Sequence, residues 1–283
     1  RRIGDTYYLV YSNIERGKPT SLGYATSKSP LGPFEYRGII IDNEKCDPAS
    51  WNNHGSIEQF NGRWYVFYHR CSRGVQQYRR LFIEPITINE DGSIDEVKMT
   101  SQGVGKSFGP GEKIMGYQAC ELQGKAFFDT DSTCGEKLTQ IEKGDQALYR
   151  YVQSESPFTV IEIAASGNGT ISVRFDGEDA GTIEIKDGQQ LSRTINNKAG
   201  TYAIGLHFLE SDALEILSIT LHQENEKHQP VPIDAYQDKK SKNRLNLLQL
   251  VFCIVMLLYL SDRRNEQQKT GCSSLSQTNK NRL

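Results

Sequence analysis

The stretch from Asn53 to Arg70 reads NHGSIEQF-NG-RWYVFYHR and decides the fold class of the first part of the chain. Asn61-Gly62 stands between two runs rich in β-branched and aromatic residues, Ser56–Phe60 and Arg63–His69. An Asn-Gly pair suits a two-residue turn in which both residues adopt positive φ, and such turns join antiparallel strands. The stretch therefore predicts a β-hairpin.

A related pattern stands earlier in the chain. Gly4-Asp5 precedes the run Thr6–Ser12, and the segment Gly4–Ser12 matches Asn61–His69 as a tight turn followed by aromatic and aliphatic residues. The two segments start about 57 residues apart, a distance that suits one four-stranded propeller blade with long loops. Further strand-like runs at Leu22–Thr26, Phe34–Ile41, Leu81–Pro85 and Ile86–Asn89 complete an all-β region over residues 1–105, without a helical period.

The rest of the chain divides by composition. Residues 106–122 are expected to be a linker because they begin with a Gly-rich stretch, and residues 123–223 contain about six strand-like runs typical of a β-sandwich. Residues 224–283 form a polar tail interrupted by the apolar segment 245–260. A bilayer span needs about 20 apolar residues, so this segment leaves three interpretations open: a membrane anchor, a packed amphipathic helix, or sequence that is not part of the working protein.

Composition excludes several classes of protein. The 283 residues carry a net charge of −2, with 37% hydrophobic and 24% charged residues. These values are ordinary for a globular protein, and a nucleic-acid-binding protein would show a basic excess. The six Cys residues lack C-x-x-C spacing, which argues against a zinc site. The chain starts at Arg1 without a signal-peptide pattern, and two blades cannot close a ring. We therefore expect the chain to be the C-terminal part of a longer protein.

Four motifs in residues 1–105 carry a resemblance to a known family. They are Tyr7–Ser12, Gly23–Phe34, Asn53–Ile57 and Gly62–Arg70. In this order and spacing they resemble the last two blades of glycoside hydrolase family 43, the five-bladed propellers of arabinofuranosidases and β-xylosidases. The resemblance implies an all-β chain built from part of a five-bladed propeller followed by the sandwich. It also implies a secreted or cell-surface parent enzyme that cleaves arabinose or xylose linkages in plant cell-wall polysaccharide.

The same resemblance implies where the catalytic groups lie. Inverting enzymes of this kind use an acid and a base about 6.5–9.5 Å apart, so that water fits between them. The family's two Asp residues and its acid Glu precede the strand that reads Tyr7–Ser12 here, which places all three upstream of Arg1. We therefore name no catalytic residue and expect this chain alone to be inactive. Glu58 and Glu84 are weaker substitutes, with an ion-paired or solvated strand Glu as the simpler interpretation.

His54 is the leading candidate for a site residue. The resemblance implies that it faces the propeller axis and supports a central calcium, through water because a hard cation prefers oxygen ligands. Asn53 is a second candidate for supporting the active centre, and Arg80 is a candidate for contacting a pentose hydroxyl or an acid. Trp51 is a candidate for stacking on a sugar ring. Each of these residues has a plainer alternative in a turn, in the core or on the surface.

Residues 123–223 resemble a family 6 carbohydrate-binding module. The motifs are Gly144–Tyr149 and Gly169–Asp176. Two departures weaken the implied sugar binding: Gln146 stands where an aromatic residue is common, and the closing strand Leu214–Ile219 lacks the expected Asn and Trp. Tyr149 remains a candidate for sugar binding. A packing role against the propeller is the competing interpretation, and the choice between arabinose and xylose stays open.

Overall fold

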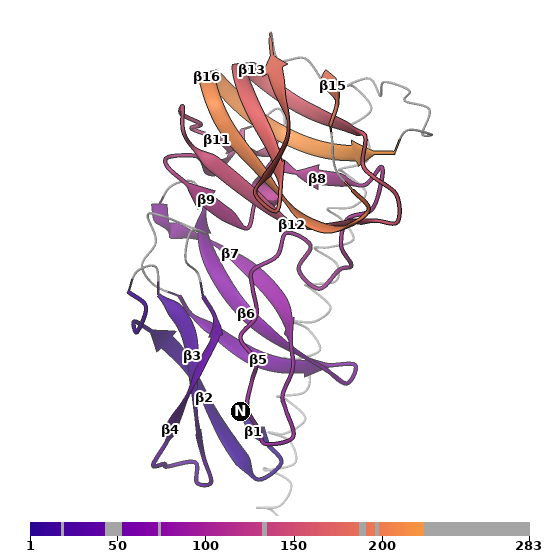
Figure 1. The fold of residues 1–283 in the computed structure, drawn as a ribbon. Helices are drawn as coiled ribbons and strands as arrows, with labels where there is room; N and C mark the ends of the chain where they lie inside the picture. Colours follow the sequence, from indigo (N-terminus) through magenta and orange to yellow (C-terminus); the bar gives the residue numbers. More distant parts are fainter. Residues whose placement is uncertain are drawn as a thin grey trace, which may run out of the picture. The chain divides into compact units, whose positions relative to one another are not determined.

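A computed structural model describes residues 1–17, 20–42, 53–72, 75–131, 135–186, 191–195 and 198–223. These residues form an all-β fold, as predicted, and the helix they contain is one turn of 3-10 helix, η1 (Gly116–Gln118). Figure 1 shows two small sheets near the N-terminus followed by a larger strand assembly. No helix among the described residues has the length and apolar character of a transmembrane span. The apolar segment 245–260 and the rest of the tail lie outside the described residues.

The first sheet is antiparallel, with the order β1-β2-β3-β4. Its strands are β1 (Arg2–Ile3), β2 (Thr6–Asn13), β3 (Ser21–Ser27) and β4 (Glu35–Ile41). The second sheet has the order β5-β6-β7, with β5 (Gly55–Phe60), β6 (Arg63–Ser72) and β7 (Val75–Ile86). A propeller blade is a four-stranded antiparallel sheet. The first sheet has this number of strands, and the second has three among the described residues.

The hairpin predicted from Asn61-Gly62 is confirmed. Asn61 has φ 49° and Gly62 has φ 77°, the positive pair that a type I′ turn needs, and Phe60 pairs with Arg63 across it. The prediction of two strands at Leu81–Pro85 and Ile86–Asn89 is wrong, because β7 runs without interruption to Ile86. Pro85 lies in β7, the edge strand of its sheet, which is the kind of strand in which Pro is found.

The two sheets bury one shared apolar core. Tyr8, Leu22 and Tyr24 contribute from the first sheet, and Ile57, Val66 and Tyr68 contribute from the second. Each of these side chains is at most 4% exposed. The alternation of side chains along a strand explains why residues two apart, such as Leu22 and Tyr24, enter the same core. Hydrophobic burial therefore joins the blades to each other.

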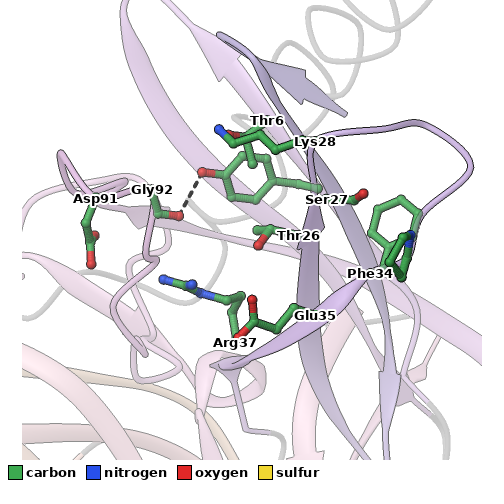
Figure 2. Close-up of a pocket in the computed structure, with 11 residues that line it drawn as sticks. Thr6, Thr26, Ser27, Lys28, Phe34, Glu35, Arg37, Asp91 and Gly92 are labelled. Carbon is green, nitrogen blue, oxygen red and sulfur yellow. Dashed lines mark hydrogen bonds between the residues drawn. The ribbon is translucent and has the colours of Figure 1, made fainter.

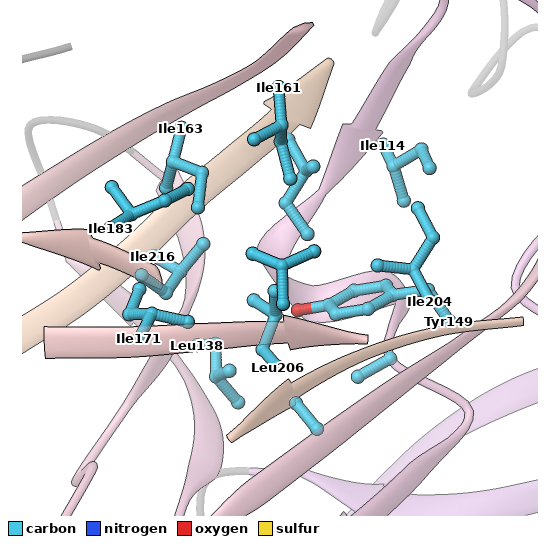
Figure 3. Packing of buried hydrophobic residues seen from close by; sticks show 14 of the residues in the cluster. Ile114, Leu138, Tyr149, Ile161, Ile163, Ile171, Ile183, Ile204, Leu206 and Ile216 are labelled. Carbon is cyan, nitrogen blue, oxygen red and sulfur yellow. The ribbon is translucent and has the colours of Figure 1, made fainter. Parts of the chain in front are cut away.

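The larger assembly contains β8 (Lys113–Met115), β9 (Glu121–Gln123), β10 (Phe127–Asp131), β11 (Gly135–Thr139), β12 (Gln146–Ser154), β13 (Val160–Phe175), β14 (Glu178–Ile185), β15 (Leu191–Thr194) and β16 (Gly200–His222). The strands follow the order β10-β11-β16-β12-β9, while β13 pairs with β14, β15 and β16, and β8 pairs with β16. Irregularities in the β13–β16 register let these long strands bend over a core of Ile, Leu, Val and Phe side chains, part of which Figure 3 shows.

Two expectations for this region need correction. Four of the predicted runs, at 158–165, 169–175, 200–208 and 214–222, merge in pairs, because β13 runs without interruption over Val160–Phe175 and β16 over Gly200–His222. The predicted linker 106–122 is partly built into the assembly, where β8 pairs with β16 and β9 pairs with β12. The physical reason is hydrophobic burial, because the side chains of Ile114, Ala119 and Leu122 lie in the core and each is at most 1% exposed.

Candidate functional site

His54 and Asn53 lie at the start of β5, beside the end of β6. The backbone N–H of His54 donates to Nδ1 of His69 over 3.1 Å, and the N–H of His69 donates to Oδ1 of Asn53 over 3.5 Å. The rings of His54 and His69 stack with centroids 5.3 Å apart. Ser12 donates to the carbonyl oxygen of Asn53, which ties the motif to the first sheet.

These contacts hold the ring of His69 in place and leave the ring of His54 exposed. Nδ1 of His69 lies within hydrogen-bond distance of both the backbone N–H of His54 (3.1 Å) and its carbonyl oxygen (3.3 Å), so either tautomer of His69 contacts the His54 backbone. Asn53 is 0% exposed and His69 is 9% exposed, whereas His54 is exposed. The two buried residues therefore hold the backbone of His54 while its ring remains accessible to a ligand or to water.

The residues at this motif do not make a calcium site by themselves. Calcium takes six to eight oxygen ligands, and the side chains here offer two imidazoles and one amide oxygen. That oxygen, Oδ1 of Asn53, already accepts from His69. Among the residues that the structure describes, no cluster of three or more His, Cys, Asp or Glu side chains is placed to hold a metal ion.

Glu84 is the one candidate carboxylate that the fold buries. It is 1% exposed on β7, where it accepts hydrogen bonds from the N–H of Thr100 at 2.8 Å, the Thr100 hydroxyl at 2.7 Å and the Tyr68 hydroxyl at 3.2 Å. Burial raises its pKa to about 7, against the opposing effects of these hydrogen bonds and of the nearby Arg150. The other substitute, Glu58, is ion-paired with Arg1, which is the simpler of the two interpretations given above.

Arg80 contacts an acid, one of the two partners that the sequence suggested for it. Arg70 and Arg80 are direct cross-strand partners on β6 and β7, so their side chains leave the sheet on the same face. Arg80 pairs with Glu136 of β11, and its guanidinium lies over the ring of Tyr117 at 4.9 Å. The acid that Arg80 contacts therefore belongs to the following strand assembly, and the contact with a pentose hydroxyl stays a prediction.

Arg70 makes the companion contact and is more deeply buried. It is 1% exposed, its Nη1 donates to the carbonyl oxygen of Ala119 at 2.8 Å, and its guanidinium lies 5.0 Å from the ring centroid of Phe82 and 5.3 Å from that of Phe128. The two arginines thus connect the second sheet to residues 117–136. In the sequence Arg70 is the last residue of the motif Gly62–Arg70, and no neighbouring residue marks it as buried.

We call these contacts of Arg70 and Arg80 with residues 117–136 the junction. Arg150 adds further contacts to it, which the sequence did not predict. Its N–H donates to Oγ of Ser101 at 3.0 Å, and its Nη1 donates to the carbonyl oxygen of Met99 at 3.1 Å. Its other guanidinium nitrogen pairs with Glu121. No local motif marks Arg150, since its partners are far away in sequence. Trp51, the other expected sugar contact, lies outside the described residues.

Tyr149 is a core residue. It is 0% exposed, its hydroxyl donates to the carbonyl oxygen of Gly116 at 3.0 Å, and burial raises its pKa. Figure 3 shows its ring among Ile114, Ile204 and Leu206. A ring enclosed in this way offers no face to a sugar, so the expected binding role is corrected to packing.

Residues 1–94 match the model of the glycosyl hydrolases family 43, which confirms the resemblance seen in the motifs. A xylosidase/arabinosidase of Thermoclostridium stercorarium is 33% identical and aligns with 78% of this chain and 54% of its own length. An arabinoxylan arabinofuranohydrolase of Paenibacillus polymyxa is 26% identical, over 78% of this chain and 39% of its own length. The chain spans about half the length or less of these two relatives.

Solved structures similar to this chain fall into two groups. A family 43 arabinoxylan arabinofuranohydrolase from Bacillus subtilis, in complex with cellotetraose, has 23% identity and a TM-score of 0.46, and covers 79% of this chain and 53% of its own. A family 6 carbohydrate-binding module from Clostridium cellulolyticum, in complex with xylose, has 18% identity and a TM-score of 0.37. It covers 41% of this chain and 99% of its own.

Proposed function

Because residues 1–94 match the family 43 glycosyl hydrolases, we propose that this chain is part of an inverting glycosidase acting on arabinose- or xylose-containing plant polysaccharides. The observation that carries the proposal is the 33% identical xylosidase/arabinosidase, whose alignment extends over 78% of the chain and so beyond the family match. Plant cell-wall polysaccharide is the proposed partner. A polymer of that size does not cross a membrane, so we further propose that the enzyme works outside the cell or on its surface.

Within this enzyme the proposed role of residues 1–105 is structural support of the reaction centre. His54 presents an exposed ring from a backbone that His69 and Asn53 hold in place. Such a ring can donate a hydrogen bond to substrate, or accept one from a water molecule bound to a cation, without reorganising. We propose that the acid and base are supplied by other blades, that calcium is held mainly by oxygen ligands from those blades, and that this chain alone does not turn over substrate.

Two forms of the protein test the proposal. The first is this chain, and the second extends it by the coding sequence that precedes the Arg1 codon. Both are assayed for release of an aryl alcohol from an aryl arabinofuranoside and an aryl xyloside. The longer form should hydrolyse at least one substrate with inversion, whereas this chain should hydrolyse neither. Efficient turnover by this chain would contradict the proposal, and so would unrelated coding sequence ahead of Arg1.

A substitution at His54 tests the role of its ring in the longer form. His54→Ala should lower kcat/KM by about tenfold or more, the range expected for loss of a positioned polar group. His207→Ala, in the strand assembly and away from residues 53–69, is the matched control and should leave kcat/KM unchanged. Equal loss in both variants would show that stability, not the His54 ring, limits the rate.

A second candidate function is favoured by the burial of Tyr149 and by the junction arginines. In this alternative the strand assembly is a packing module and the chain is a non-catalytic structural part. Retention of the chain on insoluble arabinoxylan, measured by sedimentation with and without polysaccharide, separates the two roles of the assembly. Retention that is lost after a substitution within residues 123–223 would support binding there, and no such loss would support packing.

A further inference from the structure

A pocket of about 530 Å³ lies on the first sheet, away from His54. It begins where the turn at residues 91–94 stops covering the sheet. The Tyr8 hydroxyl donates to the carbonyl oxygen of Gly92 at 2.7 Å, and the N–H of Ile94 donates to the Tyr24 hydroxyl at 2.8 Å. These bonds hold the turn against the sheet, and two of its residues, Asp91 and Gly92, line the pocket. Neither His54 nor Asn53 lines this pocket.

The strand register builds one wall of the pocket. Tyr8 of β2 pairs with Thr26 of β3, and Thr26 pairs with Glu35 of β4. Cross-strand partners in an antiparallel pair project to the same side, so these three side chains form a row. Arg37, two residues beyond Glu35, also lines the pocket. Figure 2 shows Arg37 and Glu35 beside each other below Thr26, with the guanidinium directed toward the side where Asp91 lies.

The polar groups of this pocket are balanced in charge. Arg37 and Lys28 are cationic, and Glu35 and Asp91 are anionic. Asp91 accepts from the N–H of Ser93 at 2.9 Å and from its hydroxyl at 2.6 Å, and these bonds, with help from Arg37, lower its pKa. Lys28 donates to the Thr6 hydroxyl at 2.9 Å. The lowered pKa favours the ionised form of Asp91, which presents acceptor oxygens to the pocket.

Arg37 is the group that this arrangement leaves ready for a ligand. It is exposed, and within the part of the chain that the structure describes its guanidinium makes no hydrogen bond and no ion pair. A guanidinium carries five donors in a planar fork. The Glu35 carboxylate beside it is an acceptor, so a ligand seated here meets donors and acceptors side by side. Phe34 adds an aromatic ring to the lining.

We propose that this pocket binds a neutral saccharide. Each sugar hydroxyl both donates and accepts, which matches an Arg beside two carboxylates, while the C–H face of a sugar packs on an aromatic ring. An anionic ligand would meet Glu35 and Asp91, so a sugar acid or a phosphate is disfavoured. The volume of about 530 Å³ lies within the range of small-molecule sites. The choice of a pentose oligosaccharide, in preference to another neutral sugar, rests on the proposed function.

Binding is tested with the full chain and without any hydrolysis. Xylotetraose and arabinotriose are titrated by isothermal calorimetry, and glucuronate serves as the anionic probe. We expect saturable binding of one of the two neutral oligosaccharides, weakened about fivefold or more by Arg37→Ala and by Glu35→Gln, the scale of one lost hydrogen bond. Arg63→Ala and Glu90→Gln are matched controls, since both residues are exposed and outside the pocket, and should bind like the unchanged chain.

Three results would overturn the proposal. Binding that survives Arg37→Ala would place the sugar elsewhere, for example on the strand assembly. Glucuronate binding that depends on Arg37 without neutral-sugar binding would assign the pocket to anions. No binding of either neutral oligosaccharide would leave the pocket without this ligand. None of these results bears on hydrolysis by the longer form, so a failure here and a failure of the proposed function are distinguishable.

Discussion

The buried carboxyl of Glu84 predicts a specific dependence of stability on pH. Glu84 is 1% exposed, and its hydrogen bonds from Thr100 and Tyr68 do not offset the burial, which raises its pKa from the ordinary 4.5 to about 7. The charged groups that act on it include Arg150, which favours the ionised form. The perturbation that isolates this carboxyl is Glu84→Gln, because an amide of nearly the same shape stays neutral at every pH.

The magnitude follows from linkage between protonation and folding. A difference of one pH unit in pKa corresponds to about 1.4 kcal/mol, so a change from 4.5 to about 7 amounts to about 3 kcal/mol. Below pH 4.5 the carboxyl is protonated in the folded and unfolded states, and the cost is absent. As pH rises from 4.5 to about 7 the folded state retains a proton that the unfolded state has released, and the free energy of unfolding falls. Above pH 7 the cost is constant.

Urea denaturation of the full chain between pH 4.5 and pH 8.5 measures this effect. The Glu84→Gln variant and the unchanged chain should have similar free energies of unfolding near pH 5. By pH 8 the variant should be more stable by about 3 kcal/mol. Glu90→Gln, at an exposed position, is the control and should show little pH-dependent difference. Other titrating groups are common to all three proteins, so the differences between their curves isolate the substituted positions.

One result would refute the reasoning about Glu84. If Glu84→Gln is less stable at every pH, the ionised carboxylate is the form that the fold stabilises. The two bonds from Thr100 and the field of Arg150 would then outweigh desolvation. A difference that does not vary with pH would also contradict the raised pKa, because it would mean that the Glu84 carboxyl binds protons equally in the folded and unfolded states.

Two further substitutions test the junction and the core. Arg70→Met should lower the free energy of unfolding by about 2–4 kcal/mol, because it removes a buried donor and leaves the carbonyl oxygen of Ala119 unpaired. Arg63→Met, at an exposed position, is the control and should change the free energy of unfolding little. Urea denaturation measures both variants. Tyr149→Phe should lower the free energy of unfolding by about 1 kcal/mol and leave retention on arabinoxylan unchanged. Reduced retention without a loss of stability would instead identify Tyr149 as a sugar contact.

Local signals were sufficient to predict most of the fold. The Asn61-Gly62 turn determined both the existence and the register of its hairpin, because the positive φ values it requires suit few other residue pairs. Strand boundaries were less predictable. β13 continues through Ser166–Asn168 because bulges, which depend on the paired strand β16, carry the chain through a stretch that reads as a turn.

The candidate site was predictable only in part, for a physical reason that Arg80 illustrates. A sequence shows that an Arg stands at the start of a strand, but its partner is chosen by the residue that the fold brings near, here Glu136, 56 positions away. Likewise, nothing around Tyr149 distinguishes an enclosed ring from an exposed platform until the opposing strands are in place. The open pocket at Arg37 was not predicted, because its residues come from three strands and a turn.

The junction bears on why a strand assembly follows the two blades. Arg70 is buried on the blade side, and a buried guanidinium is tolerated only when its donors find acceptors. Arg70 donates to the carbonyl oxygen of Ala119, which lies in the segment between β8 and β9. The acids that pair with Arg80 and Arg150 also come from residues 119–136. Without that segment these guanidinium groups would be buried without these acceptors, and each unpaired buried charge costs several kcal/mol of folding free energy. The segment expected to be a linker, residues 106–122, therefore supplies acceptors to the arginines Arg70 and Arg150, and the strand assembly holds that segment in position through β8 and β9.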